Sequence, residues 1–394
     1  MKAVPYTVAL FVLLFSFSET SNHPKSPRAV SRLDSLLIRY DSDVRDFFAE
    51  SKIPGAAIAI VTDDSILYMK GFGYRKIGEA DEIDANTVFR IASVSKGFAS
   101  VLTGLLVKDR LLNWDDHVTK YLPVFSLKDS TNTRSLTIRH ILSHTSGLIP
   151  HAYDNLLEAK IRFEDVARKL KDVNIVSPVG KFYAYQNVVY SLISPIIRTA
   201  TGREYEYLLS QRLLKPLGMN STSLDRAGLT ATGNFASPHI KRYGKWLPTN
   251  IKDTYYSAPA AAGINASIHD MAQWLRALVG GMPDVVPPDV VQEVSEPFIE
   301  TPYEMYRFNW NNRISSGHYG LGWRVFDYAG HKLIFHSGGI RGYTSQIAFL
   351  PQYKIGIVVL QNSRNDSLFT YKFLDMYLNL DKSEPDRQNN FSAE

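Results

Sequence analysis

The stretch FRIASVSK, residues 89–96, places Ser93 three residues before Lys96 and opens an apolar run. Residues three apart on a helix lie on the same face, so the hydroxyl and the amine are neighbours. A serine hydroxyl becomes a good nucleophile when a neighbour accepts its proton, and a neutral lysine within hydrogen-bond distance can do that. The pair predicts that Ser93 is a nucleophile and Lys96 its base.

The start of a helix suits both residues. Partial burial and the positive end of the helix dipole disfavour an ammonium on Lys96, and the same dipole favours the oxyanion that forms on attack by Ser93. Most isolated Ser-x-x-Lys pairs are nevertheless solvated helix starts, so the prediction depends on the motifs that accompany this one.

A second motif is Tyr185-Gln186-Asn187, which precedes another apolar run. Tyr185 could relay a proton to a leaving group, and Asn187 could bind an acyl-side amide and hold Lys96 in place. The plain alternative makes Asn187 a helix cap and Tyr185 an interface aromatic. A competing Tyr-x-Asn at residues 153–155 is set aside because it lies in a polar loop.

The third motif is HSGG, residues 336–339, at the end of a β-rich run. Glycines let a substrate backbone approach a strand edge, so we predict that His336, Ser337, Gly338 and Gly339 bind substrate. The N–H groups of Gly339 and Ser93 could form an oxyanion hole. The plain alternative is a glycine turn beside a structural histidine.

In this order, the three motifs resemble those of class C β-lactamases, DD-peptidases and family VIII carboxylesterases, the penicillin-binding-protein-like serine hydrolases. Residues 136–148, 216–219 and 258–264 are also similar to the family, and the likeness covers roughly residues 33 to 380. It implies an α/β fold of the β-lactamase/transpeptidase type, an antiparallel sheet flanked by helices with an inserted helical domain. It also implies acyl-enzyme chemistry with no metal or organic cofactor, in which Ser93, Lys96 and Tyr185 are catalytic.

One departure from that pattern bears on the substrate. Class C β-lactamases usually present Lys-Thr-Gly where this chain has His336-Ser337-Gly338, and histidine is mostly neutral at pH 7. We therefore rank peptidase or esterase action above β-lactam hydrolysis. Arg341 either replaces part of the missing positive charge as a substrate-binding residue or forms a surface ion pair, and Tyr343 is similarly ambiguous.

Hydrophobic periodicity divides the chain into two parts. A helix is expected from Leu33 to Phe48, and mostly helical patterns fill residues 96–285. We predict an α/β domain from residues 31–95 plus 286–380, a largely helical domain from 96–285, and a catalytic cleft between them. The expected strands cover residues 56–61, 66–72, 322–328, 332–336, 346–350 and 354–360, and a helix begins near 368.

Residues 1–18 have the layout of a signal peptide, with Lys2 before an apolar run from Val8 to Phe17. The alternative, a membrane anchor, is disfavoured because this run is about half of the roughly 20 residues that span a bilayer. We expect export to the periplasm or the extracellular space, with no stable membrane insertion after cleavage.

Composition narrows the remaining choices. The 394-residue chain has a net charge of +5, but its Lys and Arg are scattered, so nucleic-acid binding is not expected. It has no cysteine, which excludes a thiol nucleophile, and its ten histidines lack ligand spacing, so no metal is expected.

The sequence thus predicts a secreted serine hydrolase that acts through an acyl-enzyme on an ester, peptide or β-lactam carbonyl of a small molecule or short peptide. The alternative is a penicillin-binding sensor whose acyl-enzyme is long-lived. The oligomeric state is left open.

Overall fold

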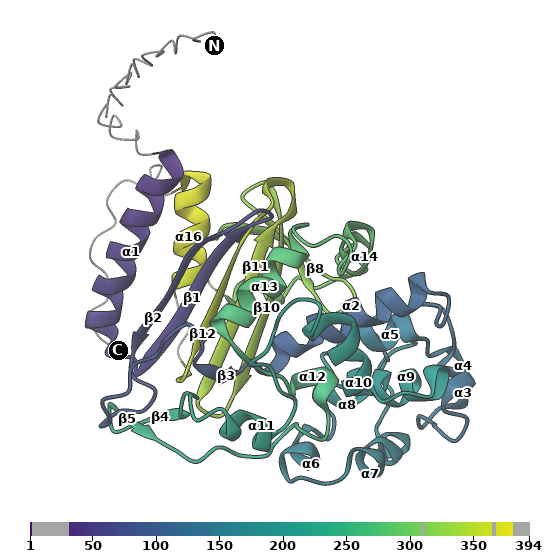
Figure 1. The fold of residues 1–394 in the computed structure, drawn as a ribbon. Coiled ribbons are helices and arrows are strands. Elements are labelled where there is room, and N and C mark those ends of the chain that lie inside the picture. Colours follow the sequence, from purple (N-terminus) through teal and green to yellow (C-terminus); the bar gives the residue numbers. More distant parts are fainter. Residues whose placement is uncertain (2–30, 309, 311, 365–367, 381–394) are drawn as a thin grey trace.

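The computed structural model describes residue 1 and residues 31–308, 310, 312–364 and 368–380. Its centre is an eight-stranded antiparallel sheet in the order β2-β1-β12-β11-β10-β9-β8-β7, so strands from both ends of the chain lie side by side (Figure 1). The strands are β1 Gly55–Thr62, β2 Ile66–Gly73, β7 Ile299–Glu300, β8 Ile314–Tyr319, β9 Arg324–Tyr328, β10 His331–Ile340, β11 Tyr343–Leu350 and β12 Ile355–Gln361. Two smaller sheets pair β3 Val88–Arg90 with β6 Asn265–Ser267 and β4 His239–Arg242 with β5 Lys245–Pro248.

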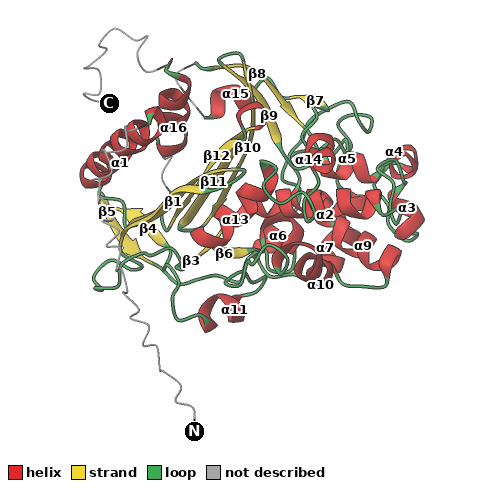
Figure 2. Cartoon of the chain, turned by 45° about the horizontal axis from the view of Figure 1, so that its top comes forward, coloured by secondary structure: helices red, strands yellow, loops and turns green. Residues whose placement is uncertain are grey.

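Helices cover both faces of the main sheet. On one side α1 and α16 lie together, and on the other lie α13 and the helical region that contains α2 (Figures 1 and 2). The helices are α1 Arg32–Ser51, α2 Ser95–Lys108, α3 Val118–Tyr121, α4 Ser130–Ser135, α5 Ile138–Leu142, α6 Asp154–Glu158, α7 Phe163–Arg168, α8 Asn187–Ser191, α9 Ile193–Thr201, α10 Tyr205–Leu209, α11 Arg226–Ala231, α12 Pro259–Ala262, α13 Ile268–Leu278, α14 Pro288–Val294, α15 Glu304–Arg307 and α16 Phe369–Leu378.

The period-two alternation of strand β1 produces two separate cores. Ile58 and Ile60 face α1 and α16, where they share a buried cluster with Tyr40 and Phe373. Alternate residues of the same strand, including Ala59, join the larger cluster on the opposite face. Since both faces of the sheet are covered, the strand is apolar throughout its length, as expected for a central strand.

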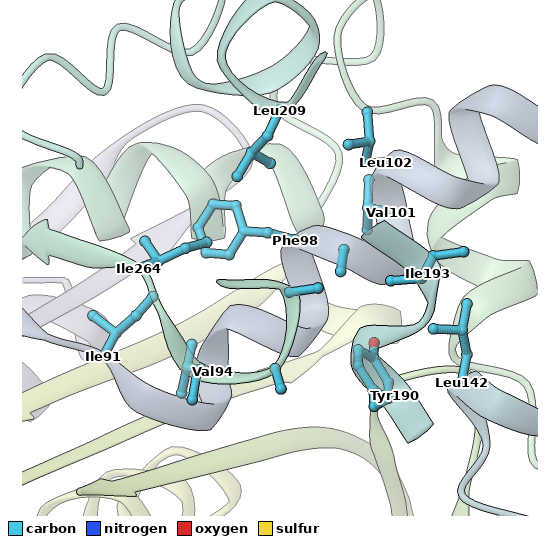
Figure 3. Packing of buried hydrophobic residues seen from close by; sticks show 14 of the residues in the cluster. Ile91, Val94, Phe98, Val101, Leu102, Leu142, Tyr190, Ile193, Leu209 and Ile264 are labelled. Atoms are coloured by element: carbon cyan, nitrogen blue, oxygen red, sulfur yellow. The ribbon is translucent and has the colours of Figure 1, made fainter. Parts of the chain in front are cut away.

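Helix α2 is embedded in the larger core. Of its 14 residues, 12 are buried, and Phe98 stacks on Trp274 of α13 at 4.1 Å between ring centroids. Figure 3 shows Phe98 pointing toward Leu209 and Ile264, which belong to distant parts of the chain. Burying an aromatic side chain of this kind stabilises the fold by about 1.5–3 kcal/mol, so the start of α2 is held rigidly.

The sequence predictions compare well with these elements. The predicted α/β class with a large antiparallel sheet is confirmed, as are the helix after Leu33 and the strands at 56–61 and 66–72. Strands β7 and β8 were not expected, and β10 continues four residues beyond the predicted end at 336, so the HSGG segment lies inside a strand rather than after one.

The division into an α/β domain and a largely helical domain stays a prediction. Within the predicted helical segment 96–285, helix α13 packs on strands β1 and β12 of the main sheet. The predicted signal peptide, residues 1–18, lies outside the described residues apart from Met1. In the part of the chain that is described, no helix is long and apolar enough to cross a membrane.

Candidate active site

Ser93 lies on a tight 3-10 turn, η1 Ala92–Val94, just before α2 begins at Ser95. The turn is fixed from both sides: Ser345 on β11 donates a hydrogen bond to the Ile91 carbonyl at 2.6 Å, and the Ile264 N–H donates to Ser95 Oγ at 3.1 Å. Ala92 has φ of 46°, a left-handed conformation that L residues rarely adopt. Such strain persists only when the surroundings impose it, and it often marks a functional turn.

The amine of Lys96 is fully buried and contacts the nucleophile. Lys96 Nζ lies 3.3 Å from Ser93 Oγ, 2.7 Å from Asn187 Oδ1 and 2.9 Å from the Ala261 carbonyl oxygen. Burial lowers the pKa of Lys96 well below its usual value, and the nearby Arg324 lowers it further, although the Asp154 carboxylate raises it. A lysine in this environment can exist as the neutral amine that accepts a proton.

Tyr185 completes the group around Ser93. It lines the same cavity as Ser93, and Lys96 Nζ lies 4.7 Å from the centroid of its ring. Burial raises the pKa of Tyr185 to about 12, even though the nearby Arg324 and Ser93 lower it. The phenol is therefore protonated at neutral pH and is suited to donate a proton rather than to act as the resting base.

Asn187 does not cap a helix. Gln186 occupies the N-cap position of α8, and the Asn187 side chain instead bridges two groups, accepting from Lys96 and donating from Nδ2 to Asp154 Oδ2 at 2.7 Å. Asp154 Oδ2 also contacts His151 Nδ1 at 2.8 Å. Asp154 thus fixes the orientation of the amide so that its oxygen faces Lys96.

Asp154 is a residue that the sequence interpretation missed. It belongs to the Tyr-x-Asn at 153–155 that was set aside, yet the fold brings both Asp154 and Asn155 to the wall of the Ser93 cavity. Its Oδ1 is buried without a hydrogen-bond partner. The motif was set aside because its loop is polar. The same polarity is the sequence signal that could have identified Asp154, since binding and catalytic residues often lie on loops.

Replacing Asp154 with asparagine is expected to move the acid limb of the kcat/KM–pH profile to lower pH. The carboxylate raises the pKa of Lys96, so removing its charge makes the amine lose its proton at lower pH, and the active form persists further into acid. Glu158→Gln is the matched control, since Glu158 lines the same cavity but is not among the groups that shift Lys96. An unmoved limb in Asp154→Asn would contradict the coupling.

Strand β10 passes directly beside the nucleophile. A Cβ on Gly338 would lie 2.9 Å from the Ser93 nitrogen and 2.3 Å from the Ile91 oxygen, so only glycine permits this approach. The neighbouring Gly339 is exposed and, together with Ser337 and Gly338, lines the cavity. The predicted binding strand is therefore next to Ser93.

The side chain of His336 does not line this cavity, although it lies on the same face of β10 as Gly338 and its ring is 6.5 Å from that of Tyr185. It is fully buried, with Nε2 3.0 Å from the Tyr319 hydroxyl and Nδ1 2.9 Å from the Ser337 carbonyl oxygen. Burial lowers the pKa of His336 well below its usual value, and Arg324 and Lys96 lower it further. His336 is thus a neutral structural partner here and places no positive charge beside a substrate.

Three arginines that sequence reasoning did not single out line the cavity: Arg324 on β9, Arg307 on α15 and Arg364 after β12. Burial lowers the pKa of Arg324, but Glu304, 2.6 Å away, more than offsets this and keeps the pKa above its usual value. Arg307 contacts the same carboxylate at 3.3 Å. Glu304 is thus paired with the guanidinium groups of both Arg324 and Arg307 and offsets part of their positive charge.

The Ser93 cavity has a volume of about 760 Å³. Of the predicted site residues, Ser93, Tyr185, Asn187, Ser337, Gly338 and Gly339 line it, Lys96 lies in direct contact with Ser93, and His336 is fully buried and does not line it. Arg341 lines a neighbouring cavity instead. In the described ranges, no group of three or more His, Cys, Asp or Glu is placed to hold a metal ion.

Comparison with known proteins agrees with this geometry. A family model described as Beta-lactamase matches residues 40–374. The chain is 28% identical over 385 residues to the Unguisins hydrolase ungD of Aspergillus violaceofuscus (strain CBS 115571), covering 85% of this chain and 64% of that protein. It is 26% identical over 338 residues to Protein flp of Staphylococcus aureus (strain COL), covering 83% of this chain and 63% of that protein. The chain thus spans less than two thirds of the length of these two relatives.

Solved structures show the same fold. The octameric penicillin-binding protein homologue from Pyrococcus abyssi superposes with a TM-score of 0.77 at 26% identity, over 87% of this chain and 77% of that chain. EstCE1, described as a hydrolase with promiscuous acyltransferase activity, superposes with a TM-score of 0.72 at 19% identity, over 87% of this chain and 98% of that chain, and is similar in fold. Because the family model matches most of its length, the chain belongs to the β-lactamase family, whose fold is that of serine hydrolases.

Proposed function

We propose that this protein hydrolyses an ester or peptide bond through an acyl-enzyme on Ser93. The observation that carries the proposal is the 3.3 Å contact between Ser93 Oγ and Lys96 Nζ, an amine whose pKa is lowered by burial. A nucleophile and a neutral base in contact are what acyl transfer to serine needs.

Acylation begins with the transfer of the Ser93 proton to Lys96. The Ser93 oxygen then attacks the substrate carbonyl carbon, and the N–H groups of Ser93 and Gly339 stabilise the resulting oxyanion in this mechanism. The exposed position of Gly339 beside the Ser93 turn supports this role. A single oxyanion donor of this kind typically contributes about 10²–10³ in kcat.

The tetrahedral intermediate breaks when the leaving group receives a proton from Tyr185. The raised pKa of Tyr185, about 12, keeps that proton available at neutral pH. Lys96, which carries the proton of Ser93, then restores the one that Tyr185 has lost. Water attacks the acyl-enzyme in the second half of the cycle and regenerates Ser93.

The charges of the site favour an ester or peptide substrate over a β-lactam. His336 stands where class C β-lactamases have a lysine, and its environment keeps it neutral. Among the relatives, the Aspergillus protein is named a hydrolase of unguisins, and EstCE1 is described as a hydrolase. We also propose that the protein is exported, since residues 1–18 have a signal-peptide layout.

Kinetics on three substrates test the proposed function. The mature protein and its Ser93→Ala variant are assayed with p-nitrophenyl butyrate, a D-Ala-D-Ala peptide and nitrocefin. We expect wild type to turn over the ester or the peptide faster than nitrocefin, and Ser93→Ala to be inactive on all three. Equal activity in both proteins would refute the role of Ser93. A stoichiometric burst followed by a stall would instead indicate a sensor with a stable acyl-enzyme.

A further inference from the structure

A second cavity, of about 530 Å³, adjoins the Ser93 cavity. The two share Glu158 and Arg364 in their walls, so they lie side by side. It is bounded by the β4–β5 hairpin and by the end of β10, where Ile340, Arg341 and Gly342 form the turn to β11. Substrate groups that extend beyond the Ser93 cavity in this direction enter it.

Four cations line this second cavity, Lys241, Lys252, Arg341 and Arg364, and in the described part of the chain they outnumber its one carboxylate, Glu158. Among the residues that the structure describes, none of the four has a carboxylate oxygen within 4.0 Å of its side-chain nitrogens. Many surface cations elsewhere are paired, for example Lys108 with Asp289 at 2.6 Å and Lys354 with Asp63 at 2.8 Å. Like charges held together without partners repel one another, and a bound anion relieves that repulsion.

The cavity also has an apolar wall. Trp246 of β5 is half-buried, and Lys241 Nζ lies 5.8 Å from the centroid of its ring. Ile340 at the end of β10 contributes a second apolar side chain. Methylene groups of a substrate can lie against these two residues while a charged end reaches the lysines and arginines.

The geometry of the reaction assigns this cavity to the acyl side of the substrate. The leaving group must lie beside its proton donor Tyr185, whose ring is 6.5 Å from that of His336, near the start of the HSGG segment. The carbonyl carbon lies at Ser93 and Gly339. The rest of the acyl group therefore runs the other way along β10, from Gly339 toward Arg341.

The edge of β10 is open for such a path. Pairing of β10 with β9 ends at Phe335 opposite Arg324, whereas pairing with β11 continues to Ile340 opposite Tyr343. In the part of the chain that the structure describes, no strand pairs with residues 336–340 on the β9 side, so an extended substrate can follow this edge. Two residues of a strand advance by about 6.6 Å, so Arg341 is about that far from Gly339 along the path.

We propose that the preferred substrate of Ser93 has an acyl group that ends in a carboxylate, which binds to Lys241, Lys252, Arg341 and Arg364 in the second cavity. This inference rests on the proposed acyl-enzyme function and names its substrate class. It gives Arg341 a substrate-binding role, at the far end of the acyl group rather than beside the leaving group.

The test compares matched esters that differ only in that charge: the mono-p-nitrophenyl ester of suberic acid and the same compound with its free carboxylate methylated. We expect wild type to prefer the anionic ester in kcat/KM. In the double variant Lys241→Gln/Lys252→Gln, the ratio of anionic to neutral kcat/KM should fall about fivefold or more, in keeping with the usual strength of exposed charge pairs. Raising the salt from about 0.01 M to about 1 M should lower the wild-type ratio, because the Debye length falls from about 30 Å to about 3 Å.

Arg242→Gln is the matched control. Arg242 follows Lys241 on β4 and is exposed, but it does not line the cavity, and successive strand residues point to opposite faces. The Arg242→Gln variant should have the same ratio of anionic to neutral kcat/KM as wild type. Equal ratios in wild type and the double variant, or a wild-type preference for the neutral ester, would overturn the inference.

Binding without turnover separates this inference from the proposed function. In calorimetry, the Ser93→Ala variant should bind monomethyl suberate more tightly than dimethyl suberate. Adding Lys241→Gln and Lys252→Gln to this variant should remove the difference in affinity. If wild type cleaves neither p-nitrophenyl ester, the proposed function fails. If it cleaves the neutral ester but Ser93→Ala shows no preference for the carboxylate, only the substrate class fails.

Discussion

Replacing Lys96 with methionine is expected to reduce kcat/KM for p-nitrophenyl butyrate by about a thousandfold, within the range that a general base contributes. Methionine matches the length of the lysine stem but cannot accept the proton of Ser93, which lies 3.3 Å from the amine. The loss should appear in kcat rather than in KM. The Lys96 amine is buried and does not line the cavity, so it acts on Ser93 and does not bind the substrate. Steady-state kinetics over a range of ester concentrations measure it.

The control for this variant is Lys108→Met on the same helix. Lys108 lies at the end of α2, where it is exposed and paired with Asp289, so its loss should leave the kinetics at the wild-type level. Circular dichroism and thermal unfolding show whether Lys96→Met remains folded. A folded Lys96→Met enzyme that keeps about a tenth or more of wild-type kcat/KM would exclude Lys96 as the base.

The substitution Gly338→Ala is expected to lower kcat/KM by about a hundredfold, the loss that follows when a reacting group moves by about 1 Å. The added Cβ would lie 2.3 Å from the Ile91 oxygen, 2.4 Å from Ser345 Oγ and 2.9 Å from the Ser93 nitrogen. Two of these three atoms belong to the backbone and cannot rotate away, so β10 and the Ser93 turn must separate. Overpacking of this kind typically lowers the free energy of unfolding by about 1–3 kcal/mol.

Gly339→Ala is the matched control for stability. The nearest atom to a Cβ on Gly339 is 3.8 Å away, an ordinary contact, so this variant should unfold at the wild-type temperature. Thermal unfolding of both variants, with ester kinetics for Gly338→Ala, checks the prediction. Wild-type activity and stability in Gly338→Ala would mean that the strand does not press on the Ser93 turn as described.

Much of the fold could be predicted because its signals are local. The helix α1 and the hairpin of β1 and β2 follow from periodicity, and α1 also begins with a capping box formed by Ser31 and Asp34. The three motifs could likewise be found because each has a fixed spacing, and the fold places Ser93, Lys96, Tyr185 and Asn187 in one group.

The rest could not be predicted because it depends on tertiary contacts. Arg324 is an ordinary strand residue in the sequence, and it becomes a buried cation only because Glu304 lies against it. In the sequence Asp154 reads as a loop residue, and only the fold brings it, at the start of α6, into contact with Asn187. Which side chains line a cavity also depends on tertiary packing: His336 is buried against Tyr319 and Arg324, and Arg341 lines a different cavity than was expected.

Acylation of Ser93 can be detected by mass spectrometry of the enzyme quenched in acid during turnover of p-nitrophenyl butyrate. We expect one butyryl group on the intact protein, located by peptide mapping on Ser93, and no adduct in Ser93→Ala. A butyryl group on another residue, or turnover by Ser93→Ala at the wild-type rate, would contradict the acylation of Ser93.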